Sequence, residues 1–568
     1  MTGAVTNLVW RLASLSWLTG PIFEKELRVS SRRRRSYALR SAYVLILTVL
    51  TASAWLSTVV IGGGGSVSYT ISRMGEFGKK LILAITWFQF FAAQLIAVVM
   101  LSSSISDEIR RGTLDVLMTT PINSFQVVAG KIFSSLLQLT LLLAISLPLL
   151  AILRVFGGMQ WSYVVSSLSI TFTAALFVGS VTMFLSIRFR RPYSVILIML
   201  ILLVIVHSIG SLLVAPFGAV NNFVAKAIML ANPAAAMLGV TYSTFPGAAV
   251  AAGSFSWPLH CLIMICTSAL ALVASALMIR RSALAQLCHA QPKRALPFLK
   301  RIVGLTWSGR AGAAAAAIRR IEGPVIIWKE LGKPISASVR SYAIVFVLLS
   351  VALILAYLLA HLSFKMPGAM MVYSILTMGL WLIASVRTAA MAATTIAKEK
   401  EARTWPLLLG TTLDDRQIIR GKAVAVLWRN LPLWLAIGVN IVAFFIFMSF
   451  FVRAGRPSEL FFYWPHILGG LITLISDVVL LTGIGLYFSV RLRSATAAVV
   501  STIGAVLGLF ILQRFLFLPL IFRVLIMAVL GRWGGGTIVH YIVPSALRMG
   551  IGLLLIWRAK CRLRRNIF

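Results

Sequence analysis

Long apolar stretches recur along the sequence, from residue 40 to residue 557. Each is about twenty residues long or longer, which is the length that a helix needs to cross the hydrocarbon core of a bilayer. We expect spans at roughly 40–62, 81–105, 131–153, 161–187, 193–216, 258–279, 341–362, 370–396, 424–450, 464–490, 495–520 and 536–557. Only 12% of the residues are charged, against about 25% in a soluble domain. The sequence therefore predicts an all-α polytopic membrane protein with about twelve transmembrane helices.

The charged residues are mostly basic and lie mainly in the loops on one side of the expected spans. The chain has 53 Lys and Arg against 14 Asp and Glu, a formal charge of +39. With the beginning of the chain in the cytoplasm, about 39 of the 53 basic residues fall in cytoplasmic segments, as the positive-inside rule requires. This pattern predicts a multi-pass protein of the plasma (inner) membrane with both termini in the cytoplasm. Because the charge is spread over every inner loop, it favours anionic membrane lipid as a partner and argues against nucleic acid.

Two polar inserts interrupt the apolar pattern, and they match each other. "DEIRRGTLDVLMTTPINSFQVVAGK" covers residues 107–131, and "KEKEARTWPLLLGTTLDDRQIIRGK" covers residues 398–422. We call them the first and the second insert. They align without a gap at a shift of 422 − 131 = 291 residues. The identical pairs are Glu108 and Glu399, Thr113 and Thr404, Leu117 and Leu408, Thr120 and Thr411, Gln126 and Gln417, and Gly130-Lys131 and Gly421-Lys422.

A second pair of similar segments precedes the first span of each half. "GPIFEKEL" begins at residue 20, and "GPVIIWKEL" begins at residue 323. Both halves start in the cytoplasm and hold six expected spans, so we predict two parallel six-helix repeats about an axis along the membrane normal. For residues 281–320, a disordered linker attracted to lipid stays open as an alternative. The expected divisions are 1–39 (cytoplasmic amphipathic lead-in segment), 40–280 (first repeat), 281–340 (basic cytoplasmic linker and second lead-in helix), 341–558 (second repeat) and 559–568 (basic cytoplasmic tail).

Each insert is expected to extend the second span of its half as a short amphipathic helix and to return through a turn. Residues 123–124 and 414–415 are suited to cap the returning helix. Lys131 and Lys422 are expected to mark the water boundary where the third span starts. The apolar stretches "LDVLM" and "WPLLL" have no evident partner within the chain, so two matched copies favour docking in a groove of a cytoplasmic protein. A solvated hairpin between two spans is the alternative.

The first insert resembles the segment after the second span in permeases of ABC-2 type transporters. That family's pattern is an acidic residue, a basic residue, Gly-Thr, a Leu-rich turn, Thr-Pro and Gly-Lys. The family's permeases have six spans and work in pairs, so this chain resembles two of them fused. The second insert departs from the pattern, because Arg403 replaces the Gly and Thr412 stands where the Pro would be. The matching residues of the first insert are Glu108, Arg111, Gly112, Thr113, Leu114, Leu117, Thr120, Pro121, Gly130 and Lys131.

This resemblance implies the permease subunit of an ATP-driven transporter, an exporter by family analogy. It would work with a separate ABC ATP-binding subunit, in two copies, and the inserts would be the coupling helices. ATP and Mg²⁺ would bind to that partner, since this sequence has no G-x-x-x-x-G-K-[ST] loop to cradle phosphates. The residues expected to contact the partner are Glu108, Arg111, Gly112, Thr113, Leu114, Leu117, Thr120 and Pro121, and in the second insert Glu399, Thr404, Leu408 and Thr411.

Polar residues inside the expected spans are a second set of candidates. Asp477 lies in the middle of a span, and a carboxylate in lipid is costly enough to be a functional candidate. Arg387, Arg429 and Arg548 are candidate counter-charges. The alternative is a structural ion pair, or a protonated Asp bonded to a neighbouring helix. No paired carboxylates, nucleophile with a base or metal-ligand cluster appears, so we expect no catalytic, cofactor or metal site in this chain.

Two other functions stay open. An ion-gradient-driven carrier would need intramembrane acidic residues in both halves, and Asp477 has no counterpart in the first half. A non-transport membrane scaffold would use the inserts only to recruit a cytoplasmic partner. The sequence does not indicate a transported substrate.

Overall fold

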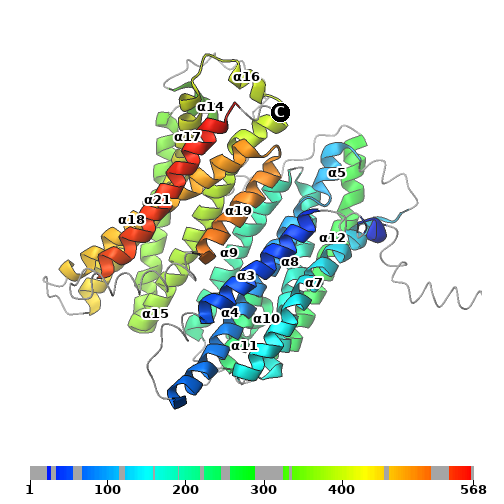
Figure 1. The fold of residues 1–568 in the computed structure, drawn as a ribbon, viewed down its shortest axis with the longest axis vertical. Coiled ribbons are helices and arrows are strands. Elements are labelled where there is room, and N and C mark those ends of the chain that lie inside the picture. Colours follow the sequence, from blue (N-terminus) through cyan, green and yellow to red (C-terminus); the bar gives the residue numbers. More distant parts are fainter. Residues whose placement is uncertain are drawn as a thin grey trace, which may run out of the picture. The chain divides into compact units, whose positions relative to one another are not determined.

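The computed structural model consists of two compact units, Met1–Thr306 and Trp307–Phe568. The division falls inside the segment expected to link the two halves. Every element within the described residues is a helix, in agreement with the all-α class (Figure 1). The structure describes residues 22–26, 28, 34–55, 67–113, 122–157, 160–189, 191–217, 223–244, 256–287, 324–331, 335–452, 460–512 and 536–564.

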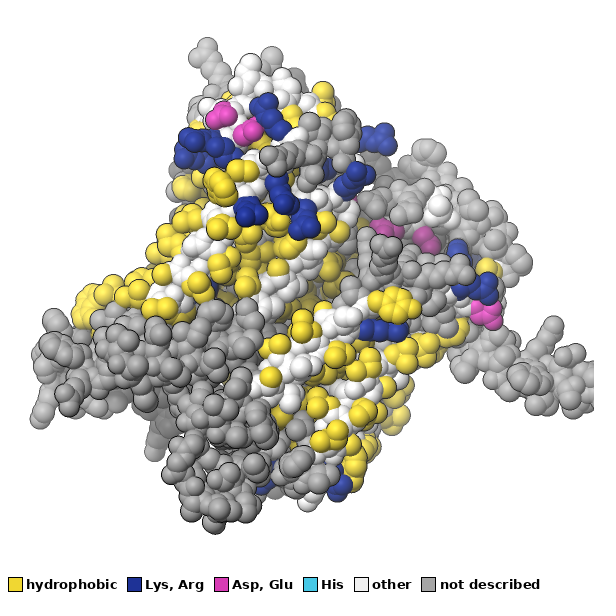
Figure 2. Space-filling view, viewed as in Figure 1, with side chains coloured by type: hydrophobic (Ala, Val, Ile, Leu, Met, Phe, Trp, Pro, Cys, Tyr) yellow, Lys and Arg dark blue, Asp and Glu magenta, His cyan; other side chains and the backbone are white. Residues whose placement is uncertain are grey.

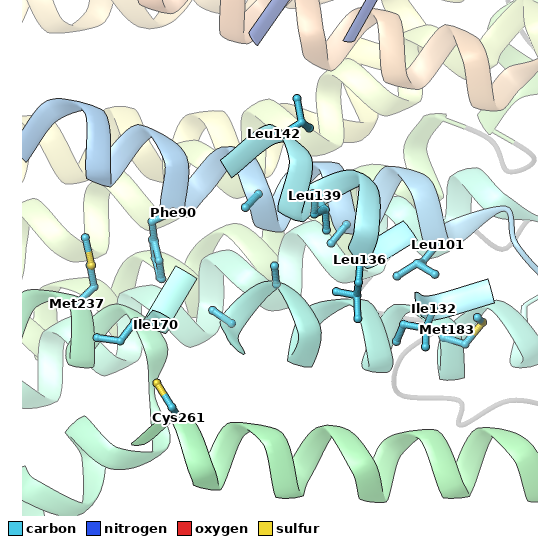
Figure 3. Close-up of a cluster of buried hydrophobic side chains, with 14 of the residues drawn as sticks. Phe90, Leu101, Ile132, Leu136, Leu139, Leu142, Ile170, Met183, Met237 and Cys261 are labelled. Atoms are coloured by element: carbon cyan, nitrogen blue, oxygen red, sulfur yellow. The ribbon is translucent and has the colours of Figure 1, made fainter. Parts of the chain in front are cut away.

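Four long helices form the core of the first unit. Helix α8 (Trp161–Arg188) packs against α4 (Val67–Ser102) and along α12 (Trp257–Leu287). Helix α7 (Ser124–Gly157) packs against α4 and directs a row of leucines into the core, including Leu136 (Figure 3). The other helices of this unit are α3 (Arg34–Trp55), α5 (Ser106–Arg111), α9 (Pro192–Phe217), α10 (Phe223–Ala231) and α11 (Pro233–Thr244).

The second unit is centred on α18 (Leu460–Arg491), which packs along α21 (Gly536–Arg562). The two helices approach so closely that a Cβ on Gly483 would meet the backbone of Gly552. Glycine on both sides of the crossing is what lets the two backbones meet. The other helices are α14 (Val325–Leu331), α15 (Ile335–Glu401), α16 (Trp405–Leu409), α17 (Asp415–Val452) and α19 (Ala495–Leu512).

Eight helices among the described residues are long and apolar enough to cross a membrane, so the chain is a multi-pass membrane protein. They are Leu81–Ile109, Ser124–Ile152, Trp161–Arg188, Trp257–Arg281, Val372–Glu401, Asp415–Ile446, Trp464–Arg491 and Tyr541–Arg562. The four remaining expected spans coincide with shorter apolar helices, so the count of twelve stays a prediction. These helices are Arg40–Val49, Pro192–Ser208, Phe346–Leu355 and Ala495–Phe510.

Helix α15 covers two expected spans in a single element. It is continuous over 67 residues, and a straight helix of that length would extend about 100 Å. Its two ends nevertheless lie at the same place, because Glu330, five residues before its start, and Glu399, near its end, both pair with Lys422. The chain must therefore turn back within Ile335–Glu401. The structure has no separate loop element between the expected spans 341–362 and 370–396, so this turn lies inside α15.

Side chains in the second unit are sorted as a membrane environment requires. Apolar side chains cover the long helices, and Lys, Arg, Asp and Glu gather at the end that carries α16 (Figure 2). Exposed leucines along these helices, such as Leu435 and Leu468, would be unfavourable in water and are suited to lipid. The second insert thus lies at the polar end of its unit.

Candidate functional site

The two inserts begin with the same backbone turn. Helix α5 ends at Gly112, which has a left-handed φ of 70°, and the Thr113 N–H donates to the Glu108 carbonyl at 3.1 Å. In the second insert Arg403 has a left-handed φ of 56°, and the Thr404 N–H donates to the Glu399 carbonyl at 3.0 Å. These are the two positive φ angles in the described backbone. Arg403 thus keeps the conformation that Gly112 adopts, although the conformation is costly for a residue with a Cβ.

The returning helix of each insert begins in the same way. The Gln126 side-chain oxygen accepts the Asn123 N–H at 3.2 Å, and the Gln417 side-chain oxygen accepts the Asp414 N–H at 3.3 Å. This contact is the second half of a capping box, in which the third helical residue reaches back to the cap. We expected the side chains of residues 123–124 and 414–415 to cap this helix. The capping role of the two glutamines was not predicted, although their identity in the two inserts could have indicated it.

A buried lysine closes the first insert. The Lys131 ammonium lies 2.5 Å from a Glu108 carboxylate oxygen and 3.8 Å from Glu26 in the lead-in segment. It also donates to the Ser104 carbonyl at 2.6 Å. Its side chain is only 6% exposed. We expected Lys131 to mark the water boundary, which stays a prediction, but its ammonium is buried in the protein and its charge is taken up by carboxylates from two other segments.

The second insert has the same arrangement. The Lys422 ammonium lies 2.9 Å from Glu330 in α14 and 3.1 Å from Glu399, and it donates to the Thr395 carbonyl at 3.2 Å. Residues 104 and 395 are themselves 291 apart, so even the backbone acceptor is matched. Lys422 is 1% exposed, so its side chain is also buried in the protein, and its place at the water boundary likewise stays a prediction. Lys329 adds a second cation at 3.1 Å from Glu399.

In each of these clusters, ion pairs hold neighbouring segments of the chain together. A buried charge is tolerated only when it is paired and hydrogen-bonded, and removal of one partner leaves the other uncompensated. Burial raises the pKa of the Glu330 carboxyl, but the positive charges of Lys422, Arg429 and Lys329 outweigh this, so its pKa lies below the usual value. Each lysine therefore joins its own helix to the lead-in segment and to the outgoing helix of the insert.

Apolar side chains reinforce the same junction. In the second unit Ile326 of α14 packs on α17, where a Cβ on Gly421 would lie 2.8 Å from the Ile326 Cβ. The buried cluster around it consists of Ile326, Ile396, Trp405, Ile418, Ile419, Val490, Ala559 and Leu563. The core of the first unit contains Ile22, Ile105, Val127, Val128, Ile187 and Ile279, of which Ile105, Val127 and Val128 correspond to Ile396, Ile418 and Ile419 at the shift of 291.

The outward face of the second insert is small and partly apolar. Trp405 of α16 is buried inside the unit, which corrects the expectation that "WPLLL" lacks a partner within the chain. Leu407, two residues on, is 74% exposed. Thr404 and Thr411 are exposed, and Leu408 is half-buried. Leu407 and its neighbour Pro406 are thus the exposed apolar residues of α16.

The remaining expected contact residues divide into three groups. Glu108 and Glu399 are engaged by the buried lysines rather than presented to solvent. Gly112 and Thr113 are exposed at the turn. Leu114, Leu117, Thr120 and Pro121 lie outside the described residues, as does the side chain of Arg111.

Asp477 has the counter-charge that the sequence proposed for it. Arg548 of α21 donates to one carboxylate oxygen, and the Trp381 indole N–H donates to the other at 3.1 Å. Arg387 instead donates to the Arg429 carbonyl at 3.4 Å. Within the described residues, no group of three or more His, Cys, Asp or Glu is arranged to hold a metal ion.

Comparison with known proteins does not place the chain in a family. No protein-family model and no curated protein sequence matches it. The functional argument therefore rests on the inserts and on their geometry.

Proposed function

We propose that this chain is the membrane-spanning permease subunit of an ATP-driven transporter of the ABC-2 type, and that it exports its substrate. The observation that carries this proposal is the pair of matched inserts, each with a left-handed turn and a buried lysine that binds two carboxylates. A device built twice at the polar ends of the helices suits a partner that binds in two copies. The partner we propose is an ABC ATP-binding subunit.

The clusters give each insert a way to act on the membrane. The outgoing helix, the returning helix and the lead-in segment meet at a single lysine, so a displacement of the insert would move all three. A loop without these contacts would absorb the displacement instead. Exposed Leu407 is suited to a shallow apolar groove on the partner, by helix-in-groove recognition.

The same contacts support two six-span repeats in parallel. In the second unit Glu330, before the first expected span, pairs with Lys422, and Ala559, after the last expected span, shares the buried cluster of Trp405. This repeat therefore starts and ends beside its insert, which requires an even number of crossings. In the first unit Glu26, before the first expected span, likewise pairs with Lys131. We infer a plasma-membrane protein with the inserts and both ends of each repeat in the cytoplasm.

The energy for transport would come from the partner. We assign ATP and Mg²⁺ to that subunit, because this sequence has no phosphate-cradling loop. Asp477 does not favour a gradient-driven carrier, since Arg548 and Trp381 already occupy both of its carboxylate oxygens. A structural ion pair is the simpler role for it.

The test is purification of the tagged chain in mild detergent, with identification of bound ATPases and measurement of ATP hydrolysis. Leu407→Glu places a charge at the exposed tip of α16 without touching the lysine cluster, and we expect it to weaken ATPase binding about tenfold or more. Arg420→Gln, an exposed change on α17, is the matched control and should bind normally. If no nucleotide-binding protein accompanies the wild-type chain, the permease proposal fails and a scaffold or carrier is favoured.

A further inference from the structure

The two described residues that follow α21 lie against the second insert. Leu563 is completely buried in the cluster that holds Trp405 and Ile418. The next residue, Arg564, places its Nε 2.9 Å from a carboxylate oxygen of Asp415. Asp415 is the first residue of α17, the returning helix of the insert. Residues remote in sequence therefore share a buried cluster with Trp405 of α16 and form an ion pair with the first residue of α17.

Leu563 and Arg564 contact a part of the second insert that has no ion pair with Lys422. Lys422 holds the end of the insert next to the membrane through Glu330 and Glu399. Trp405 lies farther out, at the start of α16, and its burial is shared with Leu563. Trp405 is 1% exposed and Leu407, in the same short helix, is 74% exposed. Because Trp405 is packed into the unit, its burial fixes the orientation of α16 and so keeps Leu407 exposed.

The first insert cannot make the same polar contact. Ile279 of α12, the last helix described in the first unit, belongs to the buried core of that unit. Ser124, however, stands at the position of Asp415 and offers no carboxylate to a basic side chain. The two inserts thus share the buried lysine but differ at the first residue of the returning helix. Asp415 forms an ion pair with Arg564, and Ser124 has no carboxylate to do so.

We propose that Leu563 and Arg564 are positioning residues that hold the second insert in the geometry it presents to its partner. The partner itself rests on the function proposed above, whereas the positioning does not. Because Arg564 is 62% exposed, its ion pair is a weak contact, and its loss should have a small effect. Leu563 is fully buried, so a charge in its place should release the insert.

A buried cysteine beneath the insert reports the release directly. In a background with the native cysteines replaced by serine, Ile418→Cys places a thiol in the cluster, where the side chain is 1% exposed. Val127→Cys is the matched control at the same position of the first insert, where the side chain is 0% exposed. The rate of reaction with a water-soluble maleimide is then measured in isolated membranes.

We expect Leu563→Asp to raise the labelling rate of Ile418→Cys about tenfold or more and to leave Val127→Cys within about twofold. Arg564→Glu should raise the rate about two- to fivefold, and the charge-swapped pair Asp415→Arg with Arg564→Glu should reverse part of that rise. An unchanged Ile418→Cys rate in Leu563→Asp overturns the proposal. So does an equal rise at both cysteines, because it would mean general unfolding.

Binding of the ATPase separates this proposal from the proposed function. If both proposals hold, Leu563→Asp should weaken ATPase binding more than Arg564→Glu does, as it raises the labelling rate of Ile418→Cys more. If the wild type binds no ATPase but the labelling pattern is as expected, the positioning stands and the permease proposal fails. If the ATPase binds and labelling does not respond, the positioning role is excluded.

Discussion

Lys131 and Lys422 each join three segments of their own unit. Each is buried, and each pairs with a carboxylate from the lead-in segment and one from the outgoing helix. Lysine is almost never fully buried unless it is paired. The pairing is therefore a structural requirement, and the loss of stability on its removal has a predictable size.

We expect Lys422→Met to destabilise the second unit by about 3–5 kcal/mol, because it leaves Glu330 and Glu399 close together without that buried cation. Lys131→Met should have an effect of the same order in the first unit. Lys329→Met is the control, since that side chain is 45% exposed and its pair should contribute less than about 1 kcal/mol. Thermal unfolding in detergent measures all three, and equal effects for Lys422→Met and Lys329→Met would contradict the argument.

The low pKa of Glu330 predicts acid sensitivity. A carboxyl whose pKa is lower in the folded state stabilises the fold at any pH above its unfolded value of about 4.3. That contribution is lost as the pH falls through the lower, folded pKa. Melting temperatures between pH 3 and pH 7 should therefore fall on the acid side, and Glu330→Gln should flatten that dependence and lower stability at pH 7. An unchanged acid slope in the variant would exclude Glu330 as a cause.

The left-handed turn predicts opposite outcomes for two matched substitutions. Arg403→Gly should stabilise the second unit by up to about 1 kcal/mol, since it removes the strain of a Cβ at positive φ. Gly112→Ala should destabilise the first unit by about 1 kcal/mol. A Cβ at Gly112 would meet nothing within 4 Å, so its cost is one of backbone conformation and not of crowding. Effects of the same sign in the two variants would show that the two turns differ.

At the scale of elements, the crossing of α18 and α21 depends on glycine. A side chain at Gly483 would collide with the backbone of Gly552, and neither backbone can move aside cheaply. We expect Gly483→Val to destabilise the second unit by several kcal/mol (about 3) and to disturb the neighbouring Asp477–Arg548 pair. Gly550→Ala is the control on α21, where a Cβ has open space. Comparable melting temperatures for the two variants would show that the helices separate freely.

The sequence predicted the elements better than the contacts between them. Apolar length located the helices, and identity at a shift of 291 located both inserts, because these signals are local in the sequence. Glu26 and Glu330 were not expected to bind the lysines, since they lie about a hundred residues from them and no periodicity joins the two. Lysine at the end of a span most often faces water, so its burial depended on partners that only the fold brings together.

At the scale of the whole molecule, the number of spans determines which residues share a side of the membrane. If α3 and α9 cross, Lys25 and Arg281 lie on the side of Thr113, opposite to Gln160. If only the four candidate spans of the first unit cross the membrane, and α3 and α9 do not, Lys25 and Arg281 both lie on the side of Gln160. The four residues are exposed, so each accepts a cysteine without disturbing the core.

A topology experiment follows from this parity. Single cysteines at Lys25, Thr113, Gln160 and Arg281 are introduced into the cysteine-free background and labelled with an impermeant maleimide, in intact cells and after permeabilisation. We expect Gln160→Cys alone to react in intact cells, because six crossings return the chain to the side of the insert. Reaction of Lys25→Cys and Arg281→Cys together with Gln160→Cys would reduce the first unit to four crossings. The lead-in segment would then lie across the membrane from the lysine that it contacts, in conflict with the Glu26–Lys131 pair.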